Sequence, residues 1–239
     1  MGKLINDDIL RGVSGSASFN AEIRIDPVNS IRLRPNIIYD LVYDQSVLYL
    51  RSTASVSTIG EKISSGILLH QQLSRISESC IGIEMNNDAV NYLHMHGISN
   101  VIVADLAQPG ITEITDNQWD FLLIAEMLEY VDNPMQFLHD ISQHYRSFIR
   151  QIIIAVPNAF GLSRINNALV YGVESANTSN KYWFTPYTIC KVAHQAGLSL
   201  ENLFMCIHED SANTINHNNQ SELLEKPILM DTIILVVTL

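Results

Sequence analysis

Short apolar runs that alternate with amphipathic helical patterns are the feature that most limits how this chain can fold. Five such runs follow one another from about residue 46: Val47–Leu50, Cys80–Ile83, Val101–Ala104, Phe121–Ala125 and Gln151–Val156. Continuous apolar runs are typical of strands covered on both faces, and strands separated by helices form βαβ units around a parallel sheet. Two later apolar runs, 198–207 and 227–239, have no helical pattern between them. We therefore expect them to form an antiparallel hairpin.

These patterns predict an α/β protein with a Rossmann-like, doubly wound and mostly parallel sheet of about seven strands. We predict one α/β domain over residues 46–239, with residues 1–45 as an N-terminal extension that packs on the sheet or on a partner. Helices are expected to begin at Asn87, after Asn133 and after Thr185, because polar capping residues or an N-terminal proline stand at these points. We predict a surface loop for the polar stretch 208–226.

Charge and composition narrow the classes of function. The chain of 239 residues carries 14 Lys and Arg against 25 Asp and Glu, a net charge of −11 without a basic cluster, which disfavours a nucleic-acid partner. No apolar window has the length of a membrane helix, and the first residues do not resemble a signal peptide. Three well-separated cysteines suggest buried, reduced thiols. We expect a cytoplasmic protein that does not contact membranes.

Acidic residues follow the second and third apolar runs, at the edge where ligands bind in an open α/β sheet. Glu84 is placed to accept two hydrogen bonds from a ribose diol, although an acid that stabilises a helix N-terminus is an equally good interpretation. Asp105 is placed to accept a hydrogen bond from an exocyclic amine. Together they indicate a nucleoside-binding edge.

A pair of glutamates follows the fourth run in the segment EMLEY. If this segment is helical, Glu126 and Glu129 lie on one face and are close enough to share a proton, a cation or a substrate. The alternative is that both carboxylates are solvated.

The motifs IGIEMNNDAV, NVIVADL, WDFLLIAEMLEYVDNP and IIIAVPNAFGL occur in the order and spacing of the class I S-adenosylmethionine-dependent methyltransferases. The chain resembles this family, and the later segment WFTPYTICKVAHQAGL resembles its small-molecule and glycan branches. The resemblance implies that Glu84 binds the cofactor ribose, with Met85 beside it, and that Asp105 binds the adenine amine, with Leu106 beside the ring. It places Glu126 at the methionine end of S-adenosylmethionine or at the acceptor.

The segment EMLEY also resembles the E-x-x-E-H element of a metal-using subset that includes the ubiquinone-biosynthesis O-methyltransferases. Here Tyr130 stands in the place of the histidine. Because tyrosine is a poor ligand for a divalent ion at its ordinary pKa, we expect no metal site.

The family's glycine-rich first motif is degenerate in this chain. In VLYLRSTASV, Tyr49 stands where the family has an acid, and Arg51, Thr53 and Ser55 stand where it has glycines. One alternative is that Ser52, Thr53 and Ser55 form an anion-accepting turn while Arg51 pairs with the methionine carboxylate. The other is that Arg51 fills the pocket and no cofactor binds.

Our leading hypothesis is an S-adenosylmethionine-dependent methyltransferase that acts on an oxygen or nitrogen of a small molecule or sugar. Glu129, Tyr130 and His144 are candidate catalytic residues. The competing hypothesis is a catalytically inactive methyltransferase-fold protein that serves as a binding module or partner subunit. The expected partners are a small-molecule or saccharide acceptor, together with a second copy of the chain or a partner protein.

Overall fold

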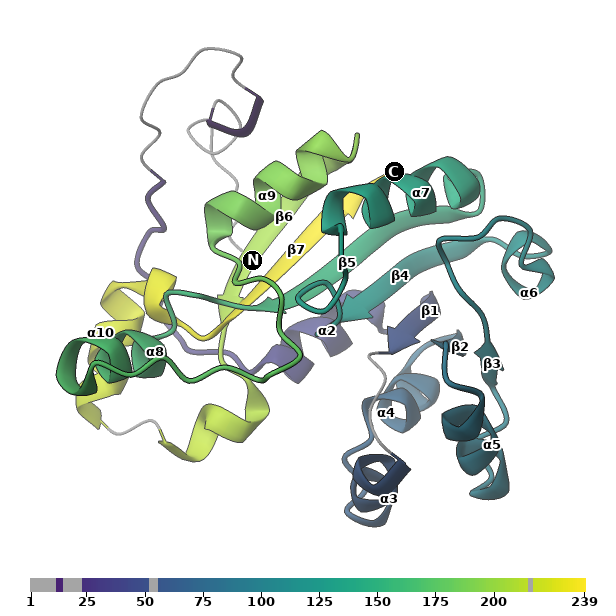
Figure 1. Ribbon diagram of the computed structural model, residues 1–239, viewed down its shortest axis with the longest axis horizontal. Coiled ribbons are helices and arrows are strands. Elements are labelled where there is room, and N and C mark those ends of the chain that lie inside the picture. The colour runs from purple at the N-terminus through teal and green to yellow at the C-terminus, as the bar shows by residue number, and fades with distance from the viewer. Residues whose placement is uncertain (1–11, 15–22, 52–55, 215–216) are drawn as a thin grey trace.

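The computed structural model describes residues 12–14, 23–51, 56–214 and 217–239. In these residues, seven strands form one sheet in the order β3-β2-β1-β4-β5-β7-β6 (Figure 1). The strands are β1 (Ser46–Arg51), β2 (Ser79–Glu84), β3 (Val101–Val103), β4 (Trp119–Ala125), β5 (Ile149–Pro157), β6 (Ser199–Cys206) and β7 (Thr232–Thr238). Strands β1 to β5 pair in parallel, whereas β7 is antiparallel to both β5 and β6. The predicted α/β fold and its C-terminal antiparallel hairpin are confirmed.

Helices connect the parallel strands and follow them toward the C-terminus. The α-helices are α2 (Arg34–Val42), α3 (Val56–Ser64), α4 (Leu69–Ile76), α5 (Asn87–Met95), α6 (Thr112–Thr115), α7 (Pro134–Tyr145), α8 (Leu162–Asn166), α9 (Pro186–Gln195) and α10 (His217–Glu225). A π-helical turn, η1 (Asn167–Tyr171), continues α8, and two short 3₁₀ turns are η2 (Glu209–Thr214) and η3 (Pro227–Leu229).

The helix starts predicted from sequence carry the expected caps. The side chain of Asn86 accepts hydrogen bonds from the N–H groups of the first turn of α5, and Asn133 caps α7 ahead of Pro134. Thr185 and Thr188 form a reciprocal capping box at the start of α9. Each cap satisfies backbone donors that have no partner within the helix, and so fixes where the helix begins.

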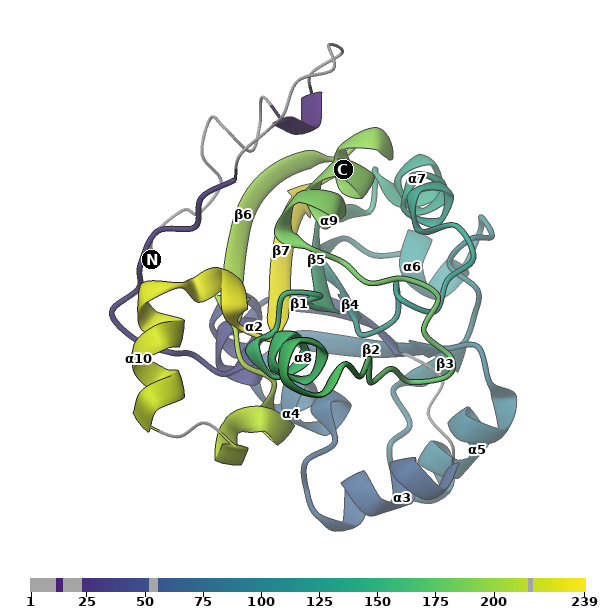
Figure 2. The ribbon, with the colours of Figure 1, turned by 60° about the vertical axis from the view of Figure 1, so that its left-hand side comes forward.

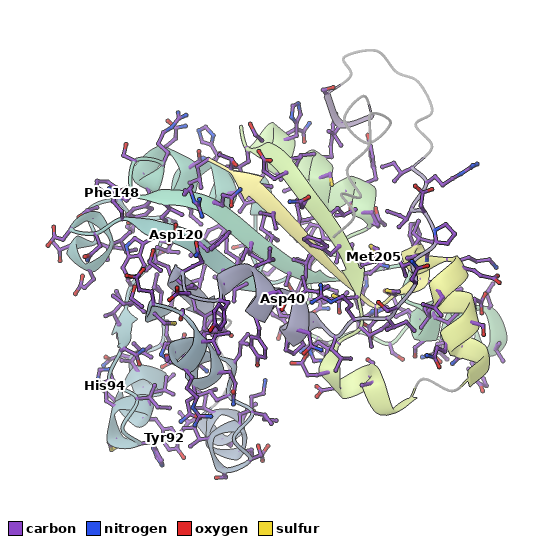
Figure 3. The ribbon with its side chains drawn as sticks, turned by 180° about the vertical axis from the view of Figure 1, so that it is seen from behind. Asp40, Tyr92, His94, Asp120, Phe148 and Met205 are labelled. Carbon is purple, nitrogen blue, oxygen red and sulfur yellow. The ribbon has the colours of Figure 1, made fainter. Side chains whose placement is uncertain are left out.

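Two apolar layers cover the sheet, one on each face. One layer joins α7 and α9 to side chains such as Leu48, Leu122 and Ile152. The other joins α2 and α4 to Val47 and Leu123, which point to the opposite face because successive strand residues alternate. Seen from behind, α2, which carries the labelled Asp40, lies against this second face (Figure 3). Covering both faces explains why the parallel strands read as continuous apolar runs.

Helix α2 lies before residue 46, in the segment for which we predicted an extension that packs on the sheet or on a partner. Its apolar residues Ile37, Ile38 and Val42 are buried against the sheet. A backbone bridge pairs Leu33 with Ile207, just after β6. The segment before α2 and the segment after β6 therefore meet, although they are far apart in sequence.

The stretch 208–226, which we predicted as a surface loop, is mostly helical in the structure, so that prediction is wrong. It contains η2 and α10. Leu223 of α10 is buried, and the backbone N–H of Val28 donates to the carbonyl of Leu224. These contacts are made with a segment far away in sequence, which the polar composition of the stretch does not reveal. In Figure 2, α10 lies at the edge of the molecule and α8 nearer to its centre, and residues of both helices line one cavity of about 380 Å³.

The absence of a side chain at Gly82 of β2 lets α4 approach the sheet closely. A Cβ atom at this position would lie 3.0 Å from both the His70 ring and a Val101 methyl group. We expect Gly82→Ala to lower the free energy of unfolding by about 1–3 kcal/mol, because overpacking forces neighbouring groups to shift. Urea denaturation measures this change, and unchanged stability would contradict the close packing.

Candidate functional site

A cleft of about 740 Å³ opens at the carboxyl ends of β2, β3 and β4. Residues from α3 and α7, from the turns after these three strands and from the segment that precedes α9 line it: Thr58, Lys62, Met85, Asp105, Met127, Tyr130, Val131, Asp132, Phe137, Asn177, Ser179 and Lys181. Its volume is within the range of small-molecule and cofactor sites, roughly 300–1,000 Å³. The position is that at which open α/β sheets bind ligands.

The residues at the ends of β2 and β3 and just after them take up different positions at this cleft. Met85 and Asp105 line it, whereas Glu84 and Leu106 are fully buried beside it. Glu84 Oε1 accepts a hydrogen bond of 3.0 Å from the backbone N–H of Asn86. Asp105 Oδ1 accepts one of 3.0 Å from Ala107. Asp105 is thus the acid of the pair that a ligand in the cleft reaches directly.

Arg51, at the end of β1, does not line the cleft. Its side chain is only 5% exposed, and it lies on the same face of the sheet as Tyr49. Its Nη1 atom is buried and has no hydrogen-bond partner in the parts of the chain that the structure describes. Ser52, Thr53 and Ser55, for which we predicted a role in cofactor binding, lie outside the described residues.

The segment after β4 is a bend followed by a turn rather than a helix, so Glu126 and Glu129 do not share a helical face. Glu126 has a φ of 52°, in the left-handed region that residues other than glycine rarely adopt. Such backbone strain costs about 1–3 kcal/mol and persists only where surrounding contacts impose it.

Those contacts come from Arg34 of α2 and from His208, after β6. Arg34 Nη1 and His208 Nε2 each lie 2.8 Å from Glu126 Oε1. Arg34 also donates to both carboxylate oxygens of Glu209, with Nε 3.1 Å from Oε2. The arginine side chain is 6% exposed. Together these four side chains, Arg34, Glu126, His208 and Glu209, form the charged cluster of the site.

The charged cluster fixes the ionisation of its members. Burial alone would raise the pKa of Glu126, but the hydrogen bond from His208 and the charge of Arg34 outweigh it and lower the pKa to about 2. Burial alone would lower the pKa of His208, but its hydrogen bond with Glu126 raises it above the ordinary value. Glu126 is therefore an ionised, engaged carboxylate and a poor proton acceptor.

Glu129, unlike Glu126, is buried and forms no ion pair within the described part of the chain. It is 1% exposed, and its Oε2 atom has no hydrogen-bond partner among the described residues. Burial raises the pKa of Glu129 to about 7, against a backbone hydrogen bond that lowers it, and the charge of Glu126 raises it further. The next residue, Tyr130, lines the cleft. A carboxyl group with a pKa near neutrality is able to take up or release a proton at physiological pH.

Two histidines of interest lie away from the cleft lining. His144 is in the last turn of α7, four residues before Phe148, which marks the beginning of β5 in Figure 3. This is the amino end of the strand, opposite to the cleft, so the structure does not support His144 as a catalytic residue. His70 is buried in α4, and its Nε2 atom lies 3.0 Å from Asn100 Oδ1, a structural role.

Sequence reasoning missed three members of the charged cluster: Arg34, His208 and Glu209. No motif marks them, because Arg34 and His208 reach Glu126 from distant parts of the chain and Glu209 joins the cluster through Arg34. The one available signal was the pairing of an apolar run ending at Ile207 with a following histidine and two acids. That pattern does not show which residues His208 and Glu209 contact.

In the described part of the chain, no three His, Cys, Asp or Glu side chains gather in a way that would hold a metal ion. None of the helices described there has both the length and the apolar character needed to cross a bilayer.

The comparisons with solved structures define the class of fold. Over 92% of this chain and 27% of the other, it superimposes on the small RNA methyltransferase HEN1 with a TM-score of 0.56 at 11% identity. A cyclopropane-fatty-acyl-phospholipid synthase-like protein from Lactobacillus casei gives 0.51 at 15% identity, covering 86% and 89% of the two chains. An S-adenosylmethionine-dependent methyltransferase from Mesorhizobium loti gives 0.50 at 11% identity, covering 86% and 95%. The fold is that of the class I methyltransferases.

The family follows from the sequence. The family model of the methionine biosynthesis protein MetW matches residues 52–220, and the chain belongs to this family. A ubiquinone biosynthesis O-methyltransferase from Aeromonas salmonicida is 24% identical over 145 residues. This match covers 58% of the chain and spans about three fifths of the length of that relative, 61%.

Proposed function

We propose that this protein is an S-adenosylmethionine-dependent methyltransferase acting on an oxygen or nitrogen of a small molecule or sugar. The observation that carries the proposal is the cleft at the carboxyl ends of β2 to β4, lined by Met85, Asp105 and Tyr130. The class I methyltransferase fold supports it, and so does the similarity to a ubiquinone biosynthesis O-methyltransferase.

The residues of the cleft fit the proposed cofactor. Asp105 uses one carboxylate oxygen for a local backbone hydrogen bond, and Oδ2 makes none with a described residue. Met85, Val131 and Phe137 supply apolar surface for a planar base. Asp105 would hold the adenine amine and Glu84 the ribose, with Met85 and Leu106 beside them. When bound, S-adenosylmethionine supplies the activated methyl group.

Arg51 is proposed to hold the carboxylate at the other end of the cofactor, together with Ser52 and Thr53. Its buried Nη1, which has no hydrogen-bond partner among the described residues, supports this role, because a buried guanidinium donor is costly unless an acceptor meets it. The same observation is also compatible with the second candidate function, that of a catalytically inactive binding module. If Arg51 instead fills the pocket and no cofactor binds, the protein is an inactive methyltransferase-fold module that binds a partner.

Within this proposal, Glu129 is the general base and Tyr130 contacts the acceptor. The acceptor oxygen or nitrogen loses a proton when it gains the methyl group, and a buried carboxylate with a pKa of about 7 is suited to receive it. The charged cluster holds the turn that carries Glu129, so Glu126 is a positioning residue rather than a ligand of the cofactor.

The remaining features of the proposal follow from composition and packing. We assign residues 46–239 to the methyltransferase domain, with the preceding segment bound to it through α2. Buried, unbridged Cys80, Cys190 and Cys206 are compatible with a reducing cytoplasm. The net charge of −11 favours a small-molecule acceptor over a nucleic acid.

Calorimetric titration with S-adenosylmethionine and S-adenosylhomocysteine tests the proposal. We expect saturable binding of both, weakened about tenfold or more by Asp105→Ala, since one lost hydrogen bond to a charged group costs at least about 1.4 kcal/mol. Asp116→Ala, an exposed aspartate after α6, is the matched control and should bind normally. No detectable binding at about 1 mM cofactor would favour the inactive module.

A further inference from the structure

A second cavity, of about 340 Å³, lies on the other side of the turn that follows β4. Glu126 lines this cavity, whereas Met127 and Tyr130 line the cofactor cleft, so the turn separates the two spaces. Apart from Pro157, the lining is entirely polar: Glu126, Ser163, Arg164, Asn167, Ser175, His208, Ser211, Asp231 and Thr232. The proposed methyl transfer uses none of the α8 residues among them.

The carboxylates of this second cavity are already engaged by the protein. Glu126 is held by Arg34 and His208. Asp231 Oδ1 accepts hydrogen bonds of 2.7 Å from the backbone N–H of His208 and 2.9 Å from the Thr232 hydroxyl. One oxygen of each carboxylate is therefore engaged by protein donors without a ligand.

The hydrogen-bond donors of the cavity, in contrast, have few acceptors among the described residues. Arg164 donates through Nη1 to the carbonyl of Asn158 at 3.0 Å, and its guanidinium carbon lies 4.6 Å from the centroid of the Trp183 ring. The side chain makes no other hydrogen bond and no close ion pair with any residue that the structure describes, although the charges of Asp231 and Glu129 act on it from farther away. The side chains of Ser163, Asn167 and Ser175 also have no hydrogen-bond partner within that part of the chain.

Arg164 is thus held in place while its remaining donors stay available. One hydrogen bond and one aromatic face fix the plane of the guanidinium, which leaves Nε and Nη2 without a described protein acceptor. A preorganised guanidinium edge matches the two oxygens of a carboxylate. The neighbouring hydroxyl and amide groups add further donors to the same wall.

We propose that this second cavity binds a small ligand that carries a carboxylate, with Arg164 as its anchor. The cavity is large enough for a metabolite-sized molecule but not for a polymer segment. The site does not depend on the proposed methyltransferase activity, because its residues and its ligand are separate from the cofactor cleft.

The two tryptophans make the test specific. Trp183 stacks on Arg164 and donates its indole N–H to Glu174, whereas Trp119 is buried and donates to the carbonyl of Ile114. We expect succinate, added to the ¹⁵N-labelled protein of 239 residues at constant ionic strength, to shift the Trp183 indole resonance saturably. The Trp119 resonance should stay in place. The neutral analogue succinamide should shift neither.

Variants and a second anion complete the design. Arg164→Gln should weaken succinate binding about tenfold or more, while Arg146→Gln, at an exposed position after α7, should not. An unchanged Trp119 resonance shows that the Arg164→Gln variant is folded. The comparison of succinate with succinamide on the wild-type protein tests the proposal even without a variant. The proposal is overturned by a Trp183 shift that does not saturate up to roughly 10 mM, by equal shifts with succinamide, or by binding of inorganic phosphate alone.

Discussion

Replacing Arg34 with methionine is expected to lower the free energy of unfolding by about 3–5 kcal/mol at neutral pH, because it leaves Glu126 and Glu209 without their buried cation. The effect should depend on pH. The pKa of Glu126 is about 2 in the folded protein against an ordinary value of 4.5, so its stabilising contribution is complete above pH 4.5. That contribution is lost as the pH falls toward 2. The difference between the two proteins should therefore shrink in acid.

A matched control for this prediction stands two residues earlier. Arg32 pairs with Asp40 at a partly exposed position, and Arg32→Met is expected to lower stability by less than about 1 kcal/mol. Urea denaturation of the three proteins between pH 3 and pH 7 provides the measurement. Equal losses for Arg34→Met and Arg32→Met would show that the charged cluster does not stabilise the fold.

Glu129→Gln is expected to stabilise the protein at pH 8 by roughly 3 kcal/mol, while removing the proposed base. The pKa of Glu129 is about 7 in the folded protein and 4.5 in the absence of burial. Below pH 4.5 the carboxyl group is mostly protonated in both the folded and the unfolded protein, so its ionisation does not lower the free energy of unfolding. As the pH rises from 4.5 to 7, the unfolded chain releases the proton while the folded protein retains it, and the fold loses stability. Glutamine avoids this loss.

Thermal and urea denaturation at pH 4 and pH 8 separate this effect from a general change in packing. The gain from Glu129→Gln should be present at pH 8 and absent at pH 4. Glu61→Gln, at an exposed site in α3, should change stability by less than about 0.5 kcal/mol at both values. A gain of equal size at both pH values would contradict the raised pKa. With an acceptor in hand, the same variant should lose roughly 10²- to 10⁴-fold in the rate of methyl transfer.

The parts of this molecule that could be predicted from sequence are those set by local chemistry. The strand cores follow from uninterrupted apolar runs, and the starts of α5, α7 and α9 follow from Asn86, Asn133 and Thr185, whose side chains cap the backbone within three residues. Met85, Asp105 and Tyr130 were found because carboxyl ends of parallel strands share one edge of the sheet.

The parts that could not be predicted depend on contacts between distant segments. The i, i+3 spacing of Glu126 and Glu129 is compatible with a helix, whereas in the structure Glu126 is left-handed and its side chain is held by Arg34 and His208. The polar segment after β6 folds into helices because Leu223 finds a buried position. Neither the partners of Glu126 nor the buried position of Leu223 can be inferred from the neighbouring sequence.

The pairing of residue 33 with residue 207 also bears on how the site forms during synthesis. The turn after β4 leaves the ribosome long before the segment that carries His208 and Glu209. Until that segment emerges, Arg34 has neither the parallel backbone neighbour nor the carboxylate that orient it. Contacts of such long sequence separation are slow to form, and domains of this size often pass through partly ordered intermediates. The turn that carries Glu126 and Glu129 is therefore among the last parts of the nascent protein to acquire its shape.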